Sequence, residues 1–338
     1  MAMRRIAVEE AFVTAEIMAA WQDVLARRDV EPGFAKMGET ILAPTPGNKV
    51  LDDRLLDIGP GRIAHMDAIG VDMQILSLTS PGVQVFEAAL ATRLAAASND
   101  ALTAAVTAHP ARFAGLAAVA PQDPAAAVRE IERAAGPLGL HGLIINSHTM
   151  GEYLAAAKYR PILEAAESLG MAIYLHPREP GPSMVTPYLD YGLFFAGWGY
   201  AAETGLHAMR LIMSGTFDRF PKLKIVLGHM GEGIPFWLQR IDNRYLLEVK
   251  IGMAKKLPRL PSEYFLDNFV ITTAGVTSMP ALRLSLDELG SERILFAADY
   301  PYEDDAEGVR FMDGATITEA ERRQIYETNA MRVFRLKA

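Results

Sequence analysis

The sequence of 338 residues contains no cysteine. Disulfide bonds and thiolate ligands are therefore excluded, and any metal ion must be held by histidine, aspartate or glutamate side chains. Long apolar runs are also missing. Residues 1–12 include two arginines and too few consecutive apolar residues for a secretory signal, and no segment is apolar enough to predict a membrane span. We therefore expect a cytoplasmic protein.

Basic residues are outnumbered by acidic ones, 33 to 41, and they form no basic stripe. The net charge of −8 and this even distribution argue against nucleic acid or an anionic membrane as partners. Half of the residues are apolar and 22% are charged, which is typical of a globular protein with a large core. Because no linker, low-complexity segment or internal repeat divides the chain, we predict a single domain over residues 1–338.

Short apolar segments rich in β-branched residues alternate with longer segments of helical periodicity. The predicted strands are residues 6–9, 73–78, 113–118, 142–145, 172–175, 224–227, 270–273 and 294–297. Asp123 followed by Pro124 predicts a helix start, and residues 203–214 and 318–336 have amphipathic helical patterns. The second of these segments opens with a capping-box pattern at Thr318.

Strands that are apolar on both faces and joined by helices predict a parallel sheet. Eight such units favour a closed (β/α)₈ TIM barrel over an open sheet, and no G-x-G-x-x-G follows the first strand. Insertions are expected near residues 26–59, 177–199 and 245–268. We interpret the second insertion as a lid over the mouth of the barrel.

Polar residues end several of the predicted strands. They are Glu9 and Glu10, Asn146, His176, His229 and Asp299. Because active sites of parallel barrels lie at the carboxyl ends of the strands, we expect these side chains to converge on one rim. A glutamate, a histidine and an aspartate suit Mn²⁺ or Zn²⁺, with Mg²⁺ a weaker candidate, and three ligands leave positions open for substrate. Alternatively, each is a polar group satisfied locally at a strand end.

The remaining histidines have simpler explanations. His109 ends a helix beside a proline, His65 and His207 lie within helices, and His141 precedes its strand at the opposite end of the barrel. His148 follows the fourth strand, and whether it reaches the mouth is left open.

Several segments resemble the metal-dependent aromatic acid decarboxylases of the amidohydrolase superfamily, which include enzymes acting on γ-resorcylate, 5-carboxyvanillate and aminocarboxymuconate semialdehyde. The matching segments, in chain order, are 8–12 (VEEAF), 67–70 (DAIG), 80–84 (SPGVQ), 121–124 (PQDP), 146–148 (NSH), 174–177 (YLHP), 227–232 (LGHMGE) and 299–302 (DYPY). The resemblance covers essentially the whole chain. It implies a TIM barrel of the amidohydrolase type and a carboxy-lyase activity.

The resemblance assigns the metal ligands to Glu9, His176 and Asp299. Alternation along a strand supports choosing one of the two adjacent glutamates, since neighbouring side chains point to opposite faces. Ala11 stands where many superfamily members have a second strand-1 histidine, and the fourth strand does not end in lysine. Both departures indicate a single metal ion.

The resemblance also implies roles for residues around the metal. His229 would contact the substrate carboxylate or a metal-bound water, and Glu232 would orient its imidazole. Arg240 reaches the site of a neighbouring subunit, which implies a homodimer or homotetramer. Tyr302 and Asn146 line the substrate pocket. As alternatives, Glu232 and Arg240 form surface ion pairs and Tyr302 is a core aromatic residue.

The implied reaction is the non-oxidative loss of CO₂ from a hydroxybenzoic acid such as 2,6-dihydroxybenzoate, 2,3-dihydroxybenzoate or 5-carboxyvanillate. The substrate chelates the metal, and Asp299 protonates the ring carbon that bears the carboxylate. Gly47, with Lys49 close by, stands where the carboxyvanillate enzyme has an arginine, which argues against that substrate. The alternatives are a mononuclear hydrolase of a lactone or amide and a non-catalytic binding protein.

Overall fold

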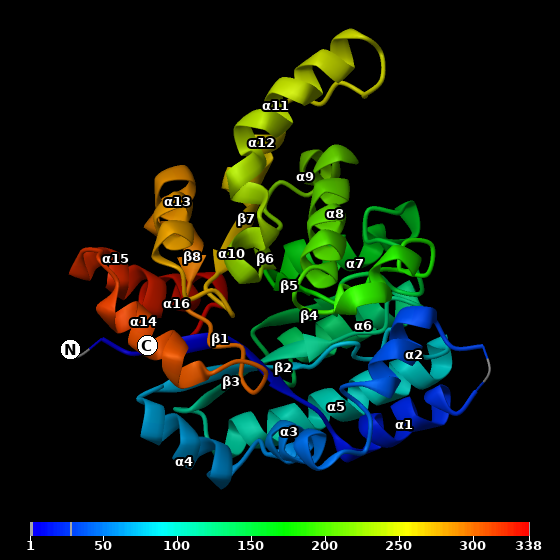
Figure 1. The fold of residues 1–338 in the computed structure, drawn as a ribbon, viewed down its shortest axis with the longest axis vertical. Coiled ribbons are helices and arrows are strands. Elements are labelled where there is room, and N and C mark those ends of the chain that lie inside the picture. The colour runs from blue at the N-terminus through cyan, green and yellow to red at the C-terminus, as the bar shows by residue number, and fades with distance from the viewer. Residues whose placement is uncertain (1–2, 28, 338) are drawn as a thin grey trace.

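The computed structural model describes residues 3–27 and 29–337 and confirms the predicted barrel. Its eight parallel strands are hydrogen-bonded in chain order, and the N–H of Val8 donates to the carbonyl of Phe296 (3.1 Å) across the seam between the first and last strands (Figure 1). The strands are β1 (Ile6–Phe12), β2 (Met73–Leu78), β3 (Phe113–Ala118), β4 (Gly142–Asn146), β5 (Ala172–His176), β6 (Ile225–Leu227), β7 (Phe269–Thr272) and β8 (Ile294–Leu295).

Helices surround the strands and complete the α/β alternation. The α-helices are α1 (Ala15–Leu25), α2 (Pro32–Glu39), α3 (Pro46–Leu56), α4 (Pro60–Ile69), α5 (Ala88–Ala108), α6 (Pro124–Ala135), α7 (Arg160–Leu169), α8 (Gly199–Met213), α9 (Thr216–Arg219), α10 (His229–Glu232), α11 (Ile234–Lys250), α12 (Pro261–Asn268), α13 (Met279–Leu289), α14 (Asp305–Gly314), α15 (Glu319–Arg323) and α16 (Asn329–Val333). Short 3₁₀ turns are η1 (Ala157–Tyr159), η2 (Thr186–Tyr188), η3 (Asp190–Gly192) and η4 (Ser291–Arg293), and η5 (Gln324–Thr328) is a π-helical turn.

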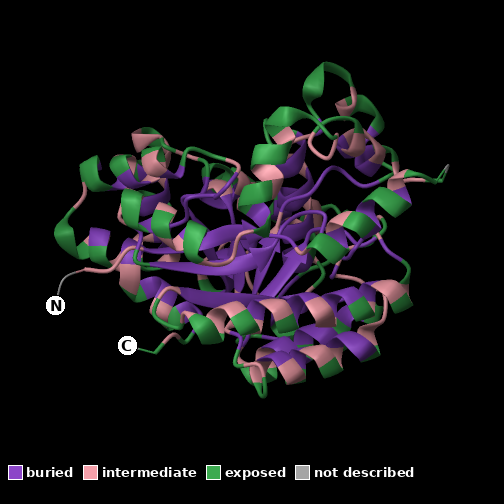
Figure 2. Cartoon of the chain, turned by 90° about the horizontal axis from the view of Figure 1, so that it is seen from below, coloured by how far each residue is buried: buried purple, intermediate pink, exposed green. Residues whose placement is uncertain are grey.

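The strands form the core of the molecule. Every strand residue is buried except His176, which is half-buried at the carboxyl end of β5. Figure 2 shows the buried strands at the centre and helices whose outer faces are exposed. The apolar, β-branched runs that predicted the strands therefore fill the barrel interior and the layer between strands and helices.

Local sequence signals explain several helix ends. The Asp123 carboxylate accepts the N–H of Ala126 at the start of α6, as predicted. The final predicted helix, residues 318–336, begins with the expected Thr318 capping box but is interrupted by the π-helical turn η5 and ends at Val333. The interruption has a clear role, since the carbonyl of Ile325 in this turn accepts the N–H of Phe296 beside β8.

The predicted insertions lie around the barrel mouth or project from it. The first contains α2 and α3, and the second contains η2 and η3. Together they supply apolar residues to the cavity described below. Figure 1 shows α11 and α12 rising away from the barrel. Within residues 3–27 and 29–337, no helix is long and apolar enough to cross a membrane.

A register shift in β1 separates the roles of its two glutamates. In the pairing with β2, Ala7 faces Gln74 whereas Glu10 faces Leu76, so β1 has one extra residue between these points. Glu9 then points into the barrel, where it contacts side chains from β5 and β7, while Glu10 contacts the chain just beyond β8. The local irregularity thus places two adjacent carboxylates in two different environments.

Candidate active site

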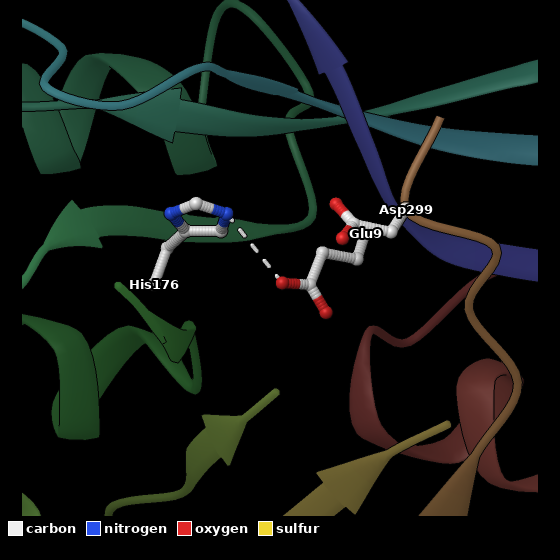
Figure 3. A group of neighbouring side chains, drawn as sticks. All are labelled: Glu9, His176 and Asp299. Atoms are coloured by element: carbon white, nitrogen blue, oxygen red, sulfur yellow. Dashed lines mark ion pairs between the residues drawn. The ribbon is translucent and has the colours of Figure 1, made fainter. Parts of the chain in front are cut away.

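Three predicted ligands meet at the carboxyl end of the barrel. Glu9 from β1, His176 from β5 and Asp299 just after β8 each offer a ligand atom, and these atoms all lie within 4.8 Å of one another. Figure 3 shows the His176 ring facing the Glu9 carboxylate, with Asp299 beside them. The distance from His176 Nε2 to Glu9 Oε1 is 3.5 Å. Residues far apart in the sequence therefore form one compact donor set.

The hydrogen bonds around this group leave its ligand atoms free. Glu9 Oε2 accepts bonds from the hydroxyls of Tyr174 and Thr272 (3.0 Å for Thr272), whereas the buried Oε1 has no hydrogen-bond partner. His176 Nδ1 lies 2.7 Å from the carbonyl of Pro177, which can only accept, so Nδ1 carries the proton and the Nε2 lone pair faces Glu9. An unpaired carboxylate oxygen beside an imidazole lone pair fits a divalent cation.

The charges of these groups also suit a cation. Burial raises the pKa of Glu9 to about 7, with His229 opposing the shift and Asp299 adding to it. Burial lowers the pKa of His176 to about 4, so this imidazole is neutral near pH 7, as a metal ligand must be. A positive charge placed among the three side chains would offset the cost of burying the two carboxylates.

His229 stands beside the donor set in α10. Its Nδ1 lies 2.9 Å from Glu232 Oε1, and its Nε2 lies 3.8 Å from Glu9 Oε1 and 3.7 Å from Asp299 Oδ2. Burial disfavours the imidazolium, but Glu232, Glu9 and Asp299 together raise the pKa of His229 well above its usual value. The neighbouring carboxylates, Glu232 foremost among them, therefore favour the imidazolium form of His229, which is hydrogen-bonded to Glu232.

The backbone of α10 is held in an unusual conformation. His229, Met230 and Glu232 have φ values of 51°, 56° and 53°, which L-residues adopt rarely. Gly231 between them has a φ of 75°, and a Cβ there would lie 2.9 Å from Ile271 Cγ2. Residues 228–233 thus form a tight turn that aims the His229 ring at the metal ligands, and glycine is needed at position 231, where β7 packs closely.

A cavity of about 110 Å³ opens beside the ligands. One wall is apolar and consists of Met37, Ile41, Leu42, Phe195 and Ala196. The opposite wall is polar: the hydroxyls of Thr79 and Tyr302 lie 2.7 Å apart, and Ser80 is next to them. No lysine or arginine among the described residues lines this cavity. Its volume is comparable to cavities that hold a single aromatic ring.

Other predicted site residues lie elsewhere. Asn146 is 2% exposed, and its Nδ2 donates to the carbonyl of Leu78 (3.4 Å), so it braces β4 against β2 and does not line the cavity. Lys49 is on the surface and forms an ion pair with Asp53 (3.0 Å). Arg240 is exposed on α11, outside the cavity.

A second group of potential ligands is already paired with an arginine. Glu31, His148 and Glu179 also lie within 4.8 Å of one another. However, the fully buried Arg178 binds both carboxylates, at 2.8 Å for Glu31. His148 uses Nε2 with the carbonyl of Glu179 (3.0 Å) and Nδ1 with the N–H of Gly151 (3.1 Å). With a guanidinium in place and both imidazole nitrogens engaged, this group is an ion-pair cluster that supports the cavity wall.

A larger groove lies between α8 and α11. Its volume is about 520 Å³, and Glu232 and Arg240 both line it. Phe236, Trp237 and Met253 are exposed on or beside α11, Met253 to 76%. The groove reaches the active site through Glu232, which holds His229.

The supporting roles of three residues were not predicted from the sequence. These residues are Tyr174 and Thr272, which bind Glu9, and Glu10, which binds the chain around Asp299. Tyr174 could have been found, because it precedes His176 by two residues and therefore points to the same face of β5. Thr272 gave no comparable signal, since a threonine in a strand is common.

The chain is similar to known proteins over most of its length. Residues 44–336 match the family model described as Amidohydrolase. A γ-resorcylate decarboxylase from Polaromonas sp. (strain JS666) is 38% identical over 299 residues, which cover 85% of this chain and 90% of the relative.

Solved structures are similar over nearly the whole chain. The 5-carboxyvanillate decarboxylase from Sphingomonas paucimobilis superposes with a TM-score of 0.96 at 46% identity, covering 99% of this chain and 100% of the other. A mutant of the enzyme of the same name from Novosphingobium aromaticivorans, with bound manganese and 3-methoxy-4-hydroxy-5-nitrobenzoic acid, gives a TM-score of 0.97 at 38% identity, with coverage of 99% and 98%.

Proposed function

The chain belongs to the amidohydrolase family, and on that basis we propose that it is a carboxy-lyase that removes CO₂ from a hydroxybenzoic acid with one divalent metal ion held by Glu9, His176 and Asp299. The main support for the proposal is a cavity the size of one aromatic ring beside the three ligands. Among the described residues, Glu9 Oε1 has no hydrogen-bond partner, and His176 Nε2 is left free because Nδ1 makes the bond to Pro177. Manganese is the preferred ion because it is bound in a similar structure, and zinc is the alternative.

A divalent cation bound here would supply positive charge, which would attract the carboxylate and phenolate oxygens of the substrate and withdraw electrons from the ring. The apolar wall of Met37, Leu42 and Phe195 then packs against the ring and excludes water. Exclusion of water favours the conversion of a charged carboxylate into neutral CO₂. The hydroxyls of Thr79 and Tyr302 are placed to bind a ring hydroxyl.

Asp299 is the proposed proton donor. The substrate phenol gives its proton to the Asp299 carboxylate on binding, and Asp299 then delivers this proton to the ring carbon that bears the carboxylate. The carbon–carbon bond breaks from the resulting dienone, its electron pair returns to the ring, and CO₂ leaves. The product is the phenolate, which takes a proton from solvent on release to become the phenol, and Asp299 is again a carboxylate.

His229 and Glu232 form the proposed carboxylate-binding pair. The imidazolium of His229, held by Glu232, attracts the substrate carboxylate. Because the charge of CO₂ is zero, this attraction ends when the bond breaks and product release is not hindered. Asn146 has no direct contact role in this scheme, since it does not line the cavity.

The cavity favours a substrate with a single carboxylate. No lysine or arginine among the described residues lines it, and Glu303 lies at its rim. Burial, with the nearby Asp299, raises the pKa of Glu303, which indicates surroundings unfavourable to further negative charge. A dihydroxybenzoate with an uncharged far edge fits better than the dicarboxylate 5-carboxyvanillate.

Arg240 and the groove between α8 and α11 are proposed to form a subunit interface. The exposed apolar residues Phe236, Trp237 and Met253 are unusual for a solvated helix and suit contact with a second copy of the chain. In a dimer or tetramer built through this face, Arg240 would reach the partner's site. The 177–199 segment, which supplies Phe195 and Ala196 to the cavity, is proposed as a lid.

The test is a substrate panel assayed with metal-loaded protein. CO₂ release from 2,6-dihydroxybenzoate or 2,3-dihydroxybenzoate, abolished by a chelator and restored by Mn²⁺, is expected. Lactones and amides belong in the same panel, because formation of a ring-opened acid without CO₂ would instead identify a hydrolase. No turnover of any member would contradict both activities.

A further inference from the structure

Glu10 is a fully buried carboxylate whose hydrogen bonds bracket a metal ligand. Its Oε1 accepts the N–H of Ala298 (3.0 Å) and its Oε2 accepts the N–H of Tyr300 (3.3 Å). These are the two residues on either side of Asp299. One side chain on β1 thus holds the N–H groups of both residues that flank Asp299, while the adjacent Glu9 faces the metal site directly.

The position of Glu10 in the barrel explains this arrangement. Where β1 meets β8, the N–H of Val8 bonds to the carbonyl of Phe296 (3.1 Å), and the N–H of Ala11 bonds to the carbonyl of Tyr300 (2.8 Å). Between these two bonds, the N–H groups of Ala298 and Tyr300 point at the Glu10 carboxylate. A side chain therefore replaces main-chain carbonyls as the acceptor at the seam of the barrel, at the point where Asp299 leaves it.

Asp299 requires such support because its backbone is strained. Its φ is 61°, in the left-handed region that L-residues rarely adopt. A residue stays in this region only when its surroundings determine the conformation. Bonds to the N–H groups of the preceding and the following residue fix the chain on both sides of Asp299, so they limit the directions in which its carboxylate can point.

Glu10 is itself firmly held. Gln74 Nε2 on β2 donates to its Oε2 (3.4 Å). Arg62 on α4 packs with its guanidinium 4.6 Å from the centre of the Tyr300 ring and donates to the carbonyl of Ala11 (2.7 Å). The chain around Asp299 is therefore held between β1 and α4, and of these three side chains Glu10 is the one that bonds to the backbone on both sides of Asp299.

We propose that Glu10 is a positioning residue that fixes Asp299 for metal binding and proton delivery by accepting the N–H groups of Ala298 and Tyr300. This inference rests on the proposed metal site, but not on the choice of substrate. Supporting groups of this kind, when removed, typically cost 10–100-fold in metal affinity or activity.

The test is Mn²⁺ binding to metal-free protein, measured by calorimetric titration. In Glu10→Gln, which has the same size, one of the two acceptor oxygens becomes an N–H donor and opposes a flanking N–H. We expect the dissociation constant to rise about tenfold, and more in Glu10→Ala. Asn99→Ala is the matched control, since Asn99 is also buried and bonds to the backbone of Ala118 (2.8 Å) on β3, a strand that supplies none of the three proposed ligands. It should lower thermal stability and leave Mn²⁺ affinity within twofold.

A double-mutant cycle separates positioning from general stability. If Glu10 acts through Asp299, then Glu10→Gln should weaken Mn²⁺ binding less than twofold in an Asp299→Ala background. An equal loss in both backgrounds would overturn the proposal, and so would unchanged affinity in folded Glu10→Gln protein. Because the readout is metal affinity, failure to find a substrate does not affect it. Should Glu10→Ala not fold, the isosteric Glu10→Gln still decides.

Discussion

The Nε2 atom of His176 lies 3.5 Å from Oε1 of Glu9, and neither atom has another hydrogen-bond partner. The second nitrogen of His176 bonds to Pro177, and the second oxygen of Glu9 bonds to Tyr174 and Thr272. Burial lowers the pKa of His176 to about 4 and raises that of Glu9 to about 7, so the imidazole is neutral near pH 7 and a divalent cation can replace any proton held by Glu9. A cation is the simplest partner for both atoms.

Metal binding should stabilise the folded protein, because the unfolded chain does not assemble the three ligands. At a free Mn²⁺ concentration 100 times the dissociation constant, the gain is about 2.7 kcal/mol. Differential scanning calorimetry of metal-free and metal-loaded protein should show a higher Tm with metal. Glu9→Gln should abolish this rise, whereas Glu31→Gln, in the ion-pair cluster, should keep it. If the increase in Tm persists in Glu9→Gln but disappears in Glu31→Gln, the metal binds at the cluster of Glu31, His148 and Glu179 instead.

Asp299→Asn should retain metal but lose turnover. The amide oxygen can still act as a ligand, but the side chain cannot accept and deliver the proton. A loss of about 10²–10⁴-fold in kcat is expected for removal of a general acid. Metal content and CO₂ release are measured on the same preparation. Substantial activity in metal-loaded Asp299→Asn would exclude Asp299 as the proton donor.

Arg240→Ala should raise KM and weaken subunit assembly if this residue completes a neighbouring site. Analytical ultracentrifugation and steady-state kinetics give the two readouts. Arg129→Ala is a suitable control, because Arg129 is exposed on α6, away from the α8 and α11 groove. Kinetics and assembly that match the control would contradict the shared-site proposal.

A second carboxylate on the substrate should be disfavoured. Placing an anion in a cavity without a paired cation costs about 1–3 kcal/mol, which corresponds to roughly 10–100-fold in kcat/KM. We therefore expect 5-carboxyvanillate to be turned over at least tenfold less efficiently than the best dihydroxybenzoate, measured side by side with Mn²⁺-loaded protein. The reverse preference would show that a cation from a partner subunit or a lid movement completes the pocket.

Stability should fall with acid because of His207. Burial lowers the pKa of this histidine to about 3, with Arg210 adding to the shift. The unfolded form, with a pKa near 6.5, binds a proton that the folded form does not, so the stabilisation is present above pH 6.5 and is lost as the pH falls toward 3. The slope is about 1.4 kcal/mol per pH unit.

Urea unfolding between pH 7 and pH 5 measures this slope. His207→Gln should be less stable at pH 7, since the bond from the Leu154 N–H to Nε2 (3.0 Å) is lost or weakened. Its free energy of unfolding should depend less steeply on pH, because unfolding of the variant takes up one proton fewer. An unchanged slope in the variant would assign the acid sensitivity to other groups.

Much of the fold was predictable because buried strands appear in the sequence as short apolar runs. The segments 73–78 and 113–118 match β2 and β3 to the residue, since both are apolar runs bounded by polar or turn residues. The ends of β8 were less predictable. The chain there leaves the ladder at residue 296 and bonds instead to Ile325 and to Glu10, which are distant in sequence.

The metal ligands were predictable for a related reason. Each follows or ends a buried run, and parallel strands bring such positions to one rim. Asn146 satisfies the same rule but braces the backbone, because its side chain lies beside Gly82 and Leu78. The rule locates the rim and does not say which side chains turn inward. The role of Glu10 was hidden for the same reason, since the register shift that turns it toward β8 depends on pairing with β2.

We expect one divalent cation to bind Glu9, His176 and Asp299. An anomalous difference map from a crystal of the manganese-loaded protein checks this expectation. We predict a single strong peak about 2.1 Å from Glu9 Oε1, His176 Nε2 and an Asp299 carboxylate oxygen. A peak at the Glu31, His148 and Glu179 cluster instead, or no peak at the three ligands in manganese-loaded crystals, would contradict the account.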